Sequence, residues 1–186
     1  FLDKADRALK AAISMIQTLQ LYNDEREDKD RQPLRIGIGL HIGSLMMGMI
    51  GDDKRLDTGL VADTVNTSSR IEGLTKQFGV DILISGAIYD QLENPENFNL
   101  RYLGEVQAKG KEEIIRLYEC FDGATDEQMR LKKESLNLFH QGVKHYYEGN
   151  FSQAEVVFSE VCKLNPADRS AKMFIEKASH QLSQIN

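Results

Sequence analysis

Apolar positions near the start of the chain repeat with helical spacing, and those that follow repeat with the spacing of strands. From residue 5 to residue 19 the apolar positions alternate between steps of four and three, which predicts an amphipathic helix. The polar run 23–33 predicts a loop. Apolar residues then alternate with polar residues or glycine over 34–41, which predicts a strand, and 45–50 is its expected hairpin partner across a turn at 43–44.

The pattern continues with helices and strands of comparable weight. Residues 63–78 have helical spacing and end at Gly79, a typical residue after a helix C-terminus. We expect the remaining elements to be a strand at 81–85, a short helix at 87–92, and strands at 99–103, 105–108 and 114–121. Helices together with strands joined by tight turns predict an α+β layer.

Beyond Gly123 the strand pattern stops. Thr125 followed by Gln128 is typical of a capping box at the start of a helix. Helical spacing then covers residues 126–148, 151–164 and 168–184. The sequence therefore predicts two domains, an α+β domain at 1–123 and an all-α domain at 124–186.

Composition and charge exclude several classes of function. Residues 124–186 hold 8 basic and 8 acidic side chains, so the whole net charge of −6 falls in residues 1–123. A nucleic-acid partner would require a cationic surface, so we expect none. The apolar run 36–50 is too short and too rich in glycine to cross a bilayer, so we expect no membrane contact. Two isolated cysteines, Cys120 and Cys162, argue against a disulfide scaffold or a zinc site and favour a reducing compartment.

One stretch carries a specific motif. It comprises Gly48-Met-Ile-Gly51, Arg55-Leu-Asp57, Asp63-Thr-Val-Asn66-Thr-Ser-Ser-Arg70-Ile-Glu72-Gly-Leu-Thr-Lys76 and, later, Val106-Gln-Ala-Lys109-Gly110-Lys111. In order and spacing this string resembles the catalytic domain of class III adenylate and guanylate cyclases. The resemblance covers residues 1–121 and implies a ferredoxin-like layer of which this chain holds the C-terminal portion.

The resemblance also implies roles for three residues. Asn66 matches the asparagine that orients the ribose, Arg70 the arginine that stabilises charge on the α-phosphate as pyrophosphate leaves, and Lys109 the lysine that contacts the triphosphate. Because Asn66 and Arg70 are four residues apart on a predicted helix, both project from one face. The alternative is structural: Asn66 bonds near the helix N-terminus and Arg70 pairs with a surface carboxylate.

The activity implied is that of an adenylate cyclase, a phosphorus–oxygen lyase that converts ATP to cyclic AMP and pyrophosphate in a homodimer. Family members use two Mg²⁺ or Mn²⁺ ions held by a pair of aspartates in the first half of the domain. The match begins just after the second aspartate, so we expect the metal ligands in an upstream segment. Because the substrate is cytoplasmic ATP, we expect a cytoplasmic location, either of a free protein or of the cytoplasmic part of a membrane-anchored one.

One departure from the family pattern concerns purine recognition. Seven residues before Asn66, where adenylate cyclases usually carry Asp or Thr, this chain has Gly59, followed by Leu60. We assign both positions to substrate binding. Because a glycine offers only its backbone to the base, the expected substrate is ATP or another purine nucleoside triphosphate. A catalytically degenerate module that senses nucleotides or docks a protein is the alternative function.

The C-terminal region has a second, shorter pattern. Gly142, Ala154, Phe158 and Pro166 lie at spacings of twelve, four and eight, which resembles one tetratricopeptide repeat. Small residues would let two helices approach, and Phe158 would fill the space between them. Such a helical-repeat tail either docks a protein partner or only caps the cyclase-like domain or a dimer interface, and the sequence favours neither.

Overall fold

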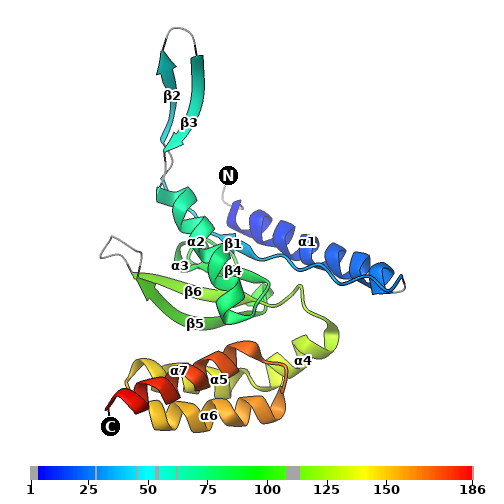
Figure 1. The fold of residues 1–186 in the computed structure, drawn as a ribbon, viewed down its shortest axis with the longest axis vertical. Helices are drawn as coiled ribbons and strands as arrows, with labels where there is room; N and C mark the ends of the chain where they lie inside the picture. Colours follow the sequence, from blue (N-terminus) through cyan, green and yellow to red (C-terminus); the bar gives the residue numbers. More distant parts are fainter. Residues whose placement is uncertain are drawn as a thin grey trace.

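The computed structural model describes residues 4–27, 29–44, 46–52, 55–61, 63–107 and 114–185. Figure 1 shows the path of the chain. The helices are α1 (Lys4–Glu27), α2 (Asp63–Phe78), α3 (Gly86–Tyr89), a 3-10 turn η1 (Pro95–Asn97), α4 (Asp126–Glu134), α5 (Leu136–Tyr147), α6 (Phe151–Leu164) and α7 (Arg169–Ile185). The strands are β1 (Ile38–Leu40), β2 (Met46–Asp52), β3 (Arg55–Val61), β4 (Ile82–Ser85), β5 (Leu100–Gln107) and β6 (Ile114–Cys120). The predicted α+β arrangement followed by helices is confirmed.

Four of the strands form one mixed sheet in the order β1-β4-β6-β5. β1 runs parallel to β4, whereas β6 is antiparallel to both β4 and β5. β2 and β3 form a separate antiparallel ribbon, with Gly48 opposite Gly59. This ribbon leads directly into α2.

The predicted hairpin of 34–41 with 45–50 is wrong, because β1 pairs with β4 and β2 pairs with β3. Both glycines of the first segment lie against α2. A Cβ added to Gly39 would lie 2.3 Å from the backbone nitrogen of Glu72, and one added to Gly37 would lie 2.0 Å from Oγ1 of Thr75. Ile38 on the opposite face packs into the core beneath α1. The strand is therefore covered on both faces, and its glycines let helix and strand backbones approach.

The first helix continues beyond its predicted end, so residues 23–27 are helical rather than part of the loop. Its last turns are tied to the extended segment that follows. The side-chain amide of Asn23 donates to the carbonyl of Leu34 and accepts from its amide, both at 2.8 Å. The Arg26 guanidinium lies over the ring of Tyr22. These polar contacts, rather than the burial of an apolar face, hold the exposed last turns of α1 in place.

The two strands predicted at 99–103 and 105–108 are a single strand, β5, with a bulge. The register against β6 shifts between Tyr102 and Gly104, and Gly104 has a φ of 106°, in the left-handed region that favours glycine. The bulge therefore interrupts the alternation of apolar residues without ending the strand.

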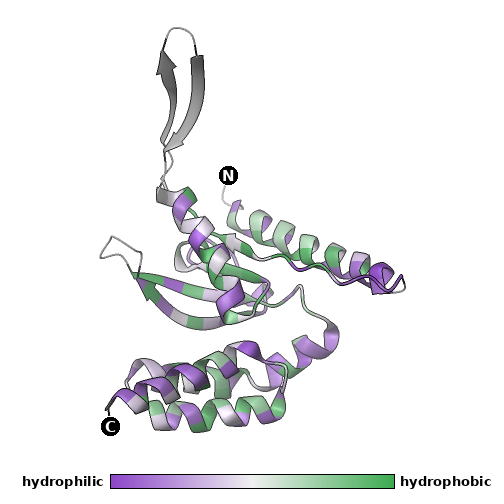
Figure 2. Cartoon of the chain, in the orientation of Figure 1, coloured by the Kyte–Doolittle hydropathy of each residue, from purple (hydrophilic) through white to green (hydrophobic). Residues whose placement is uncertain are grey.

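The two faces of the sheet have separate cores. One face is covered by α1 and α3, with Leu9 and Ile16 buried against Ile84. The other is covered by α2 and by the C-terminal helices, whose buried residues include Phe139, Phe158 and Phe174. Figure 2 shows the corresponding alternation of hydrophilic and hydrophobic residues along β5 and along α5–α7.

The C-terminal helices start at a cap and are packed closely together. Thr125 Oγ1 accepts from the amide of Gln128 at 3.4 Å, as the predicted cap requires. The helix predicted at 126–148 is divided at Ser135, which separates α4 from α5. A Cβ on Gly142 would lie 2.8 Å from the ring of Phe158, so the expected close approach of α5 and α6 is present. The hydrophobic core runs without a break from the sheet into these helices.

A buried ionic cluster joins the sheet to the C-terminal helices. Arg101 on β5 is ion-paired with Glu119 on β6 at 2.6 Å and with Asp168 just before α7, and all three side chains are about 1–2% exposed. Lys132 on α4 adds a second cation to Glu119. The guanidinium carbon of Arg101 lies 3.8 Å from the ring centroid of Phe139. The cluster thus ties the end of the sheet to α4, α5 and α7.

Within the described ranges, no helix combines the length and the apolar character that are needed to cross a bilayer.

Candidate functional site

Helix α2 carries the predicted site and is fixed against the sheet along its inner side. Ile71 and Phe78 are buried in the core that includes Leu83 of β4. The glycines of β1 allow the helix backbone to lie directly on that strand, with Gly39 beneath the turn that contains Ser68 and Glu72. The position of the helix is therefore set by packing over its middle and C-terminal turns, and in its N-terminal turns Oγ1 of Thr64 donates to the carbonyl of Ser44 at 2.6 Å.

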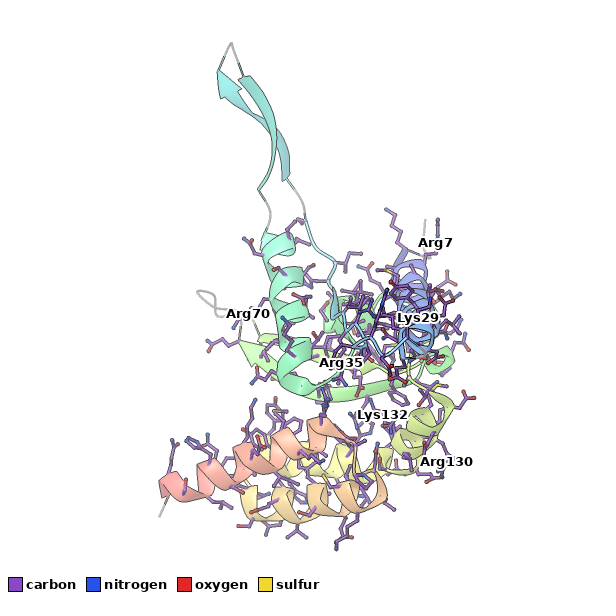
Figure 3. The ribbon with its side chains drawn as sticks, turned by 45° about the vertical axis from the view of Figure 1, so that its right-hand side comes forward. Arg7, Lys29, Arg35, Arg70, Arg130 and Lys132 are labelled. Atoms are coloured by element: carbon purple, nitrogen blue, oxygen red, sulfur yellow. The ribbon has the colours of Figure 1, made fainter. Side chains whose placement is uncertain are left out.

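Asn66 and Arg70 lie on these N-terminal turns. Asn66 is exposed and Arg70 is half-buried, and Figure 3 shows Arg70 midway along α2. In the part of the chain that the structure describes, neither side chain makes a hydrogen bond or an ion pair. Among the described residues no contact supports the structural alternative, in which Asn66 bonds near the helix N-terminus and Arg70 pairs with a surface carboxylate, so both interpretations stay predictions. Their amide and guanidinium donors, four residues apart, are available to one ligand.

The other predicted site residues are Gly59, Leu60 and Lys109. Gly59 and Leu60 lie on β3, opposite Gly48 and Met47 of β2, in the ribbon that precedes α2. The surroundings of their side chains lie outside what is described, so their assignment to base recognition stays a prediction. Lys109 also lies outside the described residues, which stop at the end of β5 and resume at β6.

The residues that position α2 are not identified by the sequence pattern. Gly37 and Gly39 provide the space in which α2 packs. Their strict alternation with Ile36, Ile38 and Leu40 is as compatible with a strand buried on both faces as with a half-exposed one. At the end of the same segment, Nδ1 of His41 lies 2.9 Å from Oγ of Ser85.

A cavity of about 640 Å³ lies at the opposite end of α2. Its lining includes Lys76 of α2, Asp81 before β4, and Arg35, and it reaches the buried Arg101. Burial raises the pKa of Asp81, an effect that outweighs the attraction of nearby cations, Lys132 first among them. Because this cavity is lined by neither Asn66 nor Arg70, we do not assign it to the predicted site.

No group of three or more His, Cys, Asp or Glu side chains among the described residues is arranged to hold a metal ion. The resemblance implies that the paired aspartates belong to an upstream segment. The chemistry of the site is therefore derived only from the chain's own donors.

A known protein family matches the part of the chain that forms the mixed sheet and α2. The model of the adenylate and guanylate cyclase catalytic domain matches residues 2–119, which include β1–β6 and α2. The chain belongs to this family. In this class III cyclase chain the match ends at the last residue but one of β6, before α4–α7.

Several curated relatives are similar to this cyclase chain. An adenylate cyclase of Anabaena cylindrica is 46% identical over 119 residues, which are 61% of this chain and 24% of the relative. Adenylate cyclase 1 of Rhizobium meliloti is 32% identical over 62% of this chain and 17% of its own length. A terminal-differentiation specific adenylate cyclase of Dictyostelium discoideum is 25% identical over 98% of this chain but only 8% of its own length. The chain thus spans a quarter or less of each of these relatives.

Solved structures show the same fold. The guanylyl cyclase Cya2 superposes with a TM-score of 0.51 at 28% identity, over 64% of this chain and 59% of that one. The adenylyl cyclase CyaB from P. aeruginosa gives a TM-score of 0.54 over 67% of this chain and 62% of that one. At 24% identity, the second likeness supports the fold alone.

Proposed function

We propose that this chain is part of a nucleotidyl cyclase that converts ATP to cyclic AMP and pyrophosphate. The observation that carries the proposal is the pair of donors Asn66 and Arg70, four residues apart on a packed α2, which have no partner among the residues that the structure describes. Family membership supports the reaction class. Adenylate cyclases among the relatives support ATP, whereas Gly59 leaves room for GTP as an alternative substrate.

The reaction is an intramolecular displacement at phosphorus. The ribose 3′-oxygen forms a bond to the α-phosphorus, the bond from the α-phosphorus to the bridging oxygen of pyrophosphate breaks, and the hydroxyl proton leaves with pyrophosphate. The side-chain amide of Asn66 would hold the ribose so that its 3′-oxygen faces the α-phosphate. The planar guanidinium of Arg70 would donate to the non-bridging α-phosphate oxygens, where charge changes in the transition state.

The site needs further groups beyond α2. The family resemblance implies a homodimer in which Asn66 and Arg70 of one subunit meet the other subunit's metal-binding half. Because the resemblance implies that the metal-binding aspartates lie upstream, the ligands for two Mg²⁺ or Mn²⁺ ions are expected from outside the described residues, which hold no cluster of three or more candidate ligands. We place Lys109 at the triphosphate, with Gly59 and Leu60 beside the base.

For residues 124–186 we propose a cap that resembles a tetratricopeptide repeat rather than an independent docking module. The support is packing: Phe139 and Val143 of α5 and Phe174 of α7 share one core with Leu103 and Leu117 of the sheet. The inner side of these helices is thus occupied by the sheet. Any protein partner of the tail would have to bind the outer side of α6, where Val156 is 63% exposed.

Replacing Asn66 by alanine tests the proposed function. In the full-length protein supplied with ATP and a divalent metal, Asn66→Ala is expected to lower cyclic AMP formation by about 100-fold, as expected for the loss of one preorganised donor. Gln77→Ala, an exposed amide near the other end of α2, is the matched control and should retain wild-type turnover. Equal rates in both variants would refute the assignment, and tight ATP binding without any turnover in the wild type would favour a nucleotide sensor.

A further inference from the structure

The cavity of about 640 Å³ lies where the sheet domain meets the C-terminal helices. Its walls are the second half of α1, the extended segment before β1, the C-terminal end of α2, and the segments that lead into α4 and α7. A cavity of this size can hold a small organic ligand, and such sites are common where two structural units meet. Figure 3 shows two of its lining residues, Arg35 from the segment before β1 and Lys132 from α4.

Hydrogen bonds between these elements hold the walls of the cavity in place. The hydroxyl of Ser170, near the start of α7, donates to the carbonyl of Phe78 at the end of α2 at 2.8 Å. The side-chain amide of Gln20 on α1 donates to the carbonyl of Gly123 in the segment before α4. The cavity is therefore preformed by contacts that belong to the fold, which lowers the entropic cost of binding a ligand in it.

Two arginines in the lining have guanidinium groups without a partner. Arg35 and Arg169 make no hydrogen bond or ion pair within the described part of the chain, whereas Arg101 and Lys132, which also line the cavity, are paired with buried carboxylates. A Cβ on Gly79 would lie 2.3 Å from Cβ of Arg169, so the stem of this arginine packs on the glycine backbone. A guanidinium is a planar fork of donors that matches two oxygens of one carboxylate, phosphate or sulfonate.

One carboxylate of the lining, that of Asp81, lies among these cations. Burial raises the pKa of Asp81, and Lys132, Arg35 and Arg169 are cations that oppose this rise, yet none of the three is ion-paired with it. The other carboxylates of the lining that have no partner among the described residues belong to the last turns of α1, and they are Asp24 and Glu27. An anionic group that reached the two arginines would therefore meet one opposing charge nearby, that of Asp81.

Part of the lining is apolar and only half-covered. Leu34 and Ile36, on either side of Arg35, are 46% and 39% exposed, and Leu19 of α1 lines the same cavity. Removing apolar surface of this kind from water is favourable, so an apolar ligand body would gain by covering it. The cavity thus combines apolar surface with guanidinium groups.

We propose that this cavity is a second ligand site, which binds a small organic anion with an apolar body and holds the acidic group with Arg35 and Arg169. A ligand there would contact the C-terminal end of α2 and the helical tail at once. The site lies apart from Asn66 and Arg70, and the inference does not rest on the proposed function.

The probe for this site is 8-anilinonaphthalene-1-sulfonate, which carries one sulfonate on an apolar aromatic body and fluoresces when it leaves water. Fluorescence titration of the full-length protein gives its dissociation constant. Arg35→Met and Arg169→Met keep an apolar stem and remove the charge, so each should raise this constant about 5- to 10-fold, the effect of one partly exposed charged contact. Arg7→Met, an exposed position near the start of α1 and outside the lining, is the matched control and should leave it unchanged. Equal constants in all three variants, or no saturable binding to the wild type, would overturn the proposal.

Asp81→Asn should change the affinity in the opposite direction. Because the change removes the carboxylate that opposes the sulfonate, the dissociation constant of the probe should fall at least about 3-fold. An unchanged or higher constant would contradict an anion site at this position.

An uncharged analogue separates the effect of charge from that of the apolar body. N-phenyl-1-naphthylamine has the same aromatic body without the sulfonate, and it should bind to wild type and to Arg169→Met with equal affinity. If both probes lose affinity equally in Arg169→Met, the arginine does not hold the acidic group.

Arg70→Ala distinguishes this site from the predicted nucleotide site. A probe in the cavity should bind to this variant as it binds to the wild type, whereas weaker binding would place the probe at the nucleotide site and overturn the proposal. None of these titrations depends on turnover, so they remain decisive even if the full-length protein forms no cyclic nucleotide and the proposed function fails.

Discussion

An Asp168→Ala variant is expected to lose about 3–5 kcal/mol of unfolding free energy, because it leaves a buried cation without one of its two carboxylates. Asp168 pairs with Arg101 in a cluster where both side chains are about 1% exposed. Its carboxylate also accepts from the amide of Ala171 at 3.0 Å, so the change also removes a bond at the start of α7. The denaturation midpoint in urea should fall accordingly.

The matched control is an exposed ion pair on α4. Arg130 and Glu134 are paired at 2.7 Å with side chains 59% and 49% exposed, so Glu134→Ala should cost no more than about 0.5 kcal/mol. If Asp168→Ala loses no more unfolding free energy than Glu134→Ala, the ionic cluster does not hold helices α4–α7 against the sheet.

The difference in unfolding free energy between wild type and Asp168→Ala should change with pH in one direction only. Burial alone would raise the pKa of the Asp168 carboxyl, but the Arg101 guanidinium holds this pKa below its usual range. The stabilisation from Asp168 is therefore fully present above the unfolded-state pKa of about 4 and is lost as the pH falls through the lower folded-state value. The stability gap between wild type and Asp168→Ala should accordingly narrow only in acid.

Arg70→Ala is expected to slow cyclic nucleotide formation by the full-length protein by about 100- to 1,000-fold. The physical reason is the loss of a fixed fork of donors at the α-phosphate, where charge is redistributed as pyrophosphate leaves. Because this contact strengthens in the transition state, kcat should fall more than the affinity for ATP. Steady-state kinetics with ATP measures both quantities.

Two further variants sharpen the Arg70 measurement. Arg70→Lys keeps the charge but not the fork, so it should recover only part of the lost rate. Lys76→Ala removes an exposed cation from the same helix near the separate cavity and should leave kcat unchanged. If Arg70→Ala and Lys76→Ala have equal kcat values, Arg70 does not act at the reacting phosphate.

Local pattern was sufficient to predict α2 and the placement of Asn66 and Arg70 on it, because a helix with a clear apolar face and a glycine stop is determined by nearby residues. The pairing of β1 was not predictable in this way. Whether Gly37 and Gly39 face water or a helix depends on α2, more than twenty residues later. The bulge at Gly104 was missed as well, since it appears in the sequence as a break between two strands.

The ionic cluster depends on contacts that are still more distant. Arg101 alternates with apolar neighbours in a strand and by pattern alone is an ordinary exposed position. Its burial requires Asp168, 67 residues later, together with the helices that close over it. Tyr147 likewise belongs to no motif, and its hydroxyl accepts a hydrogen bond from the backbone amide of Glu105, 42 residues earlier. Sequence periodicity indicates which face of each helix or strand is apolar, but it does not indicate which of these faces pack together.

The most direct test of the central claim is the identity of the product formed from ATP by the purified full-length protein. Chromatography with parallel detection of pyrophosphate should find one cyclic AMP for each pyrophosphate released, at a rate that falls to background when Asn66 and Arg70 are both replaced by alanine. A parallel reaction with GTP measures the preference that Gly59 leaves open. Formation of ADP and phosphate instead, or a cyclic AMP yield unchanged by the double replacement, would contradict the account.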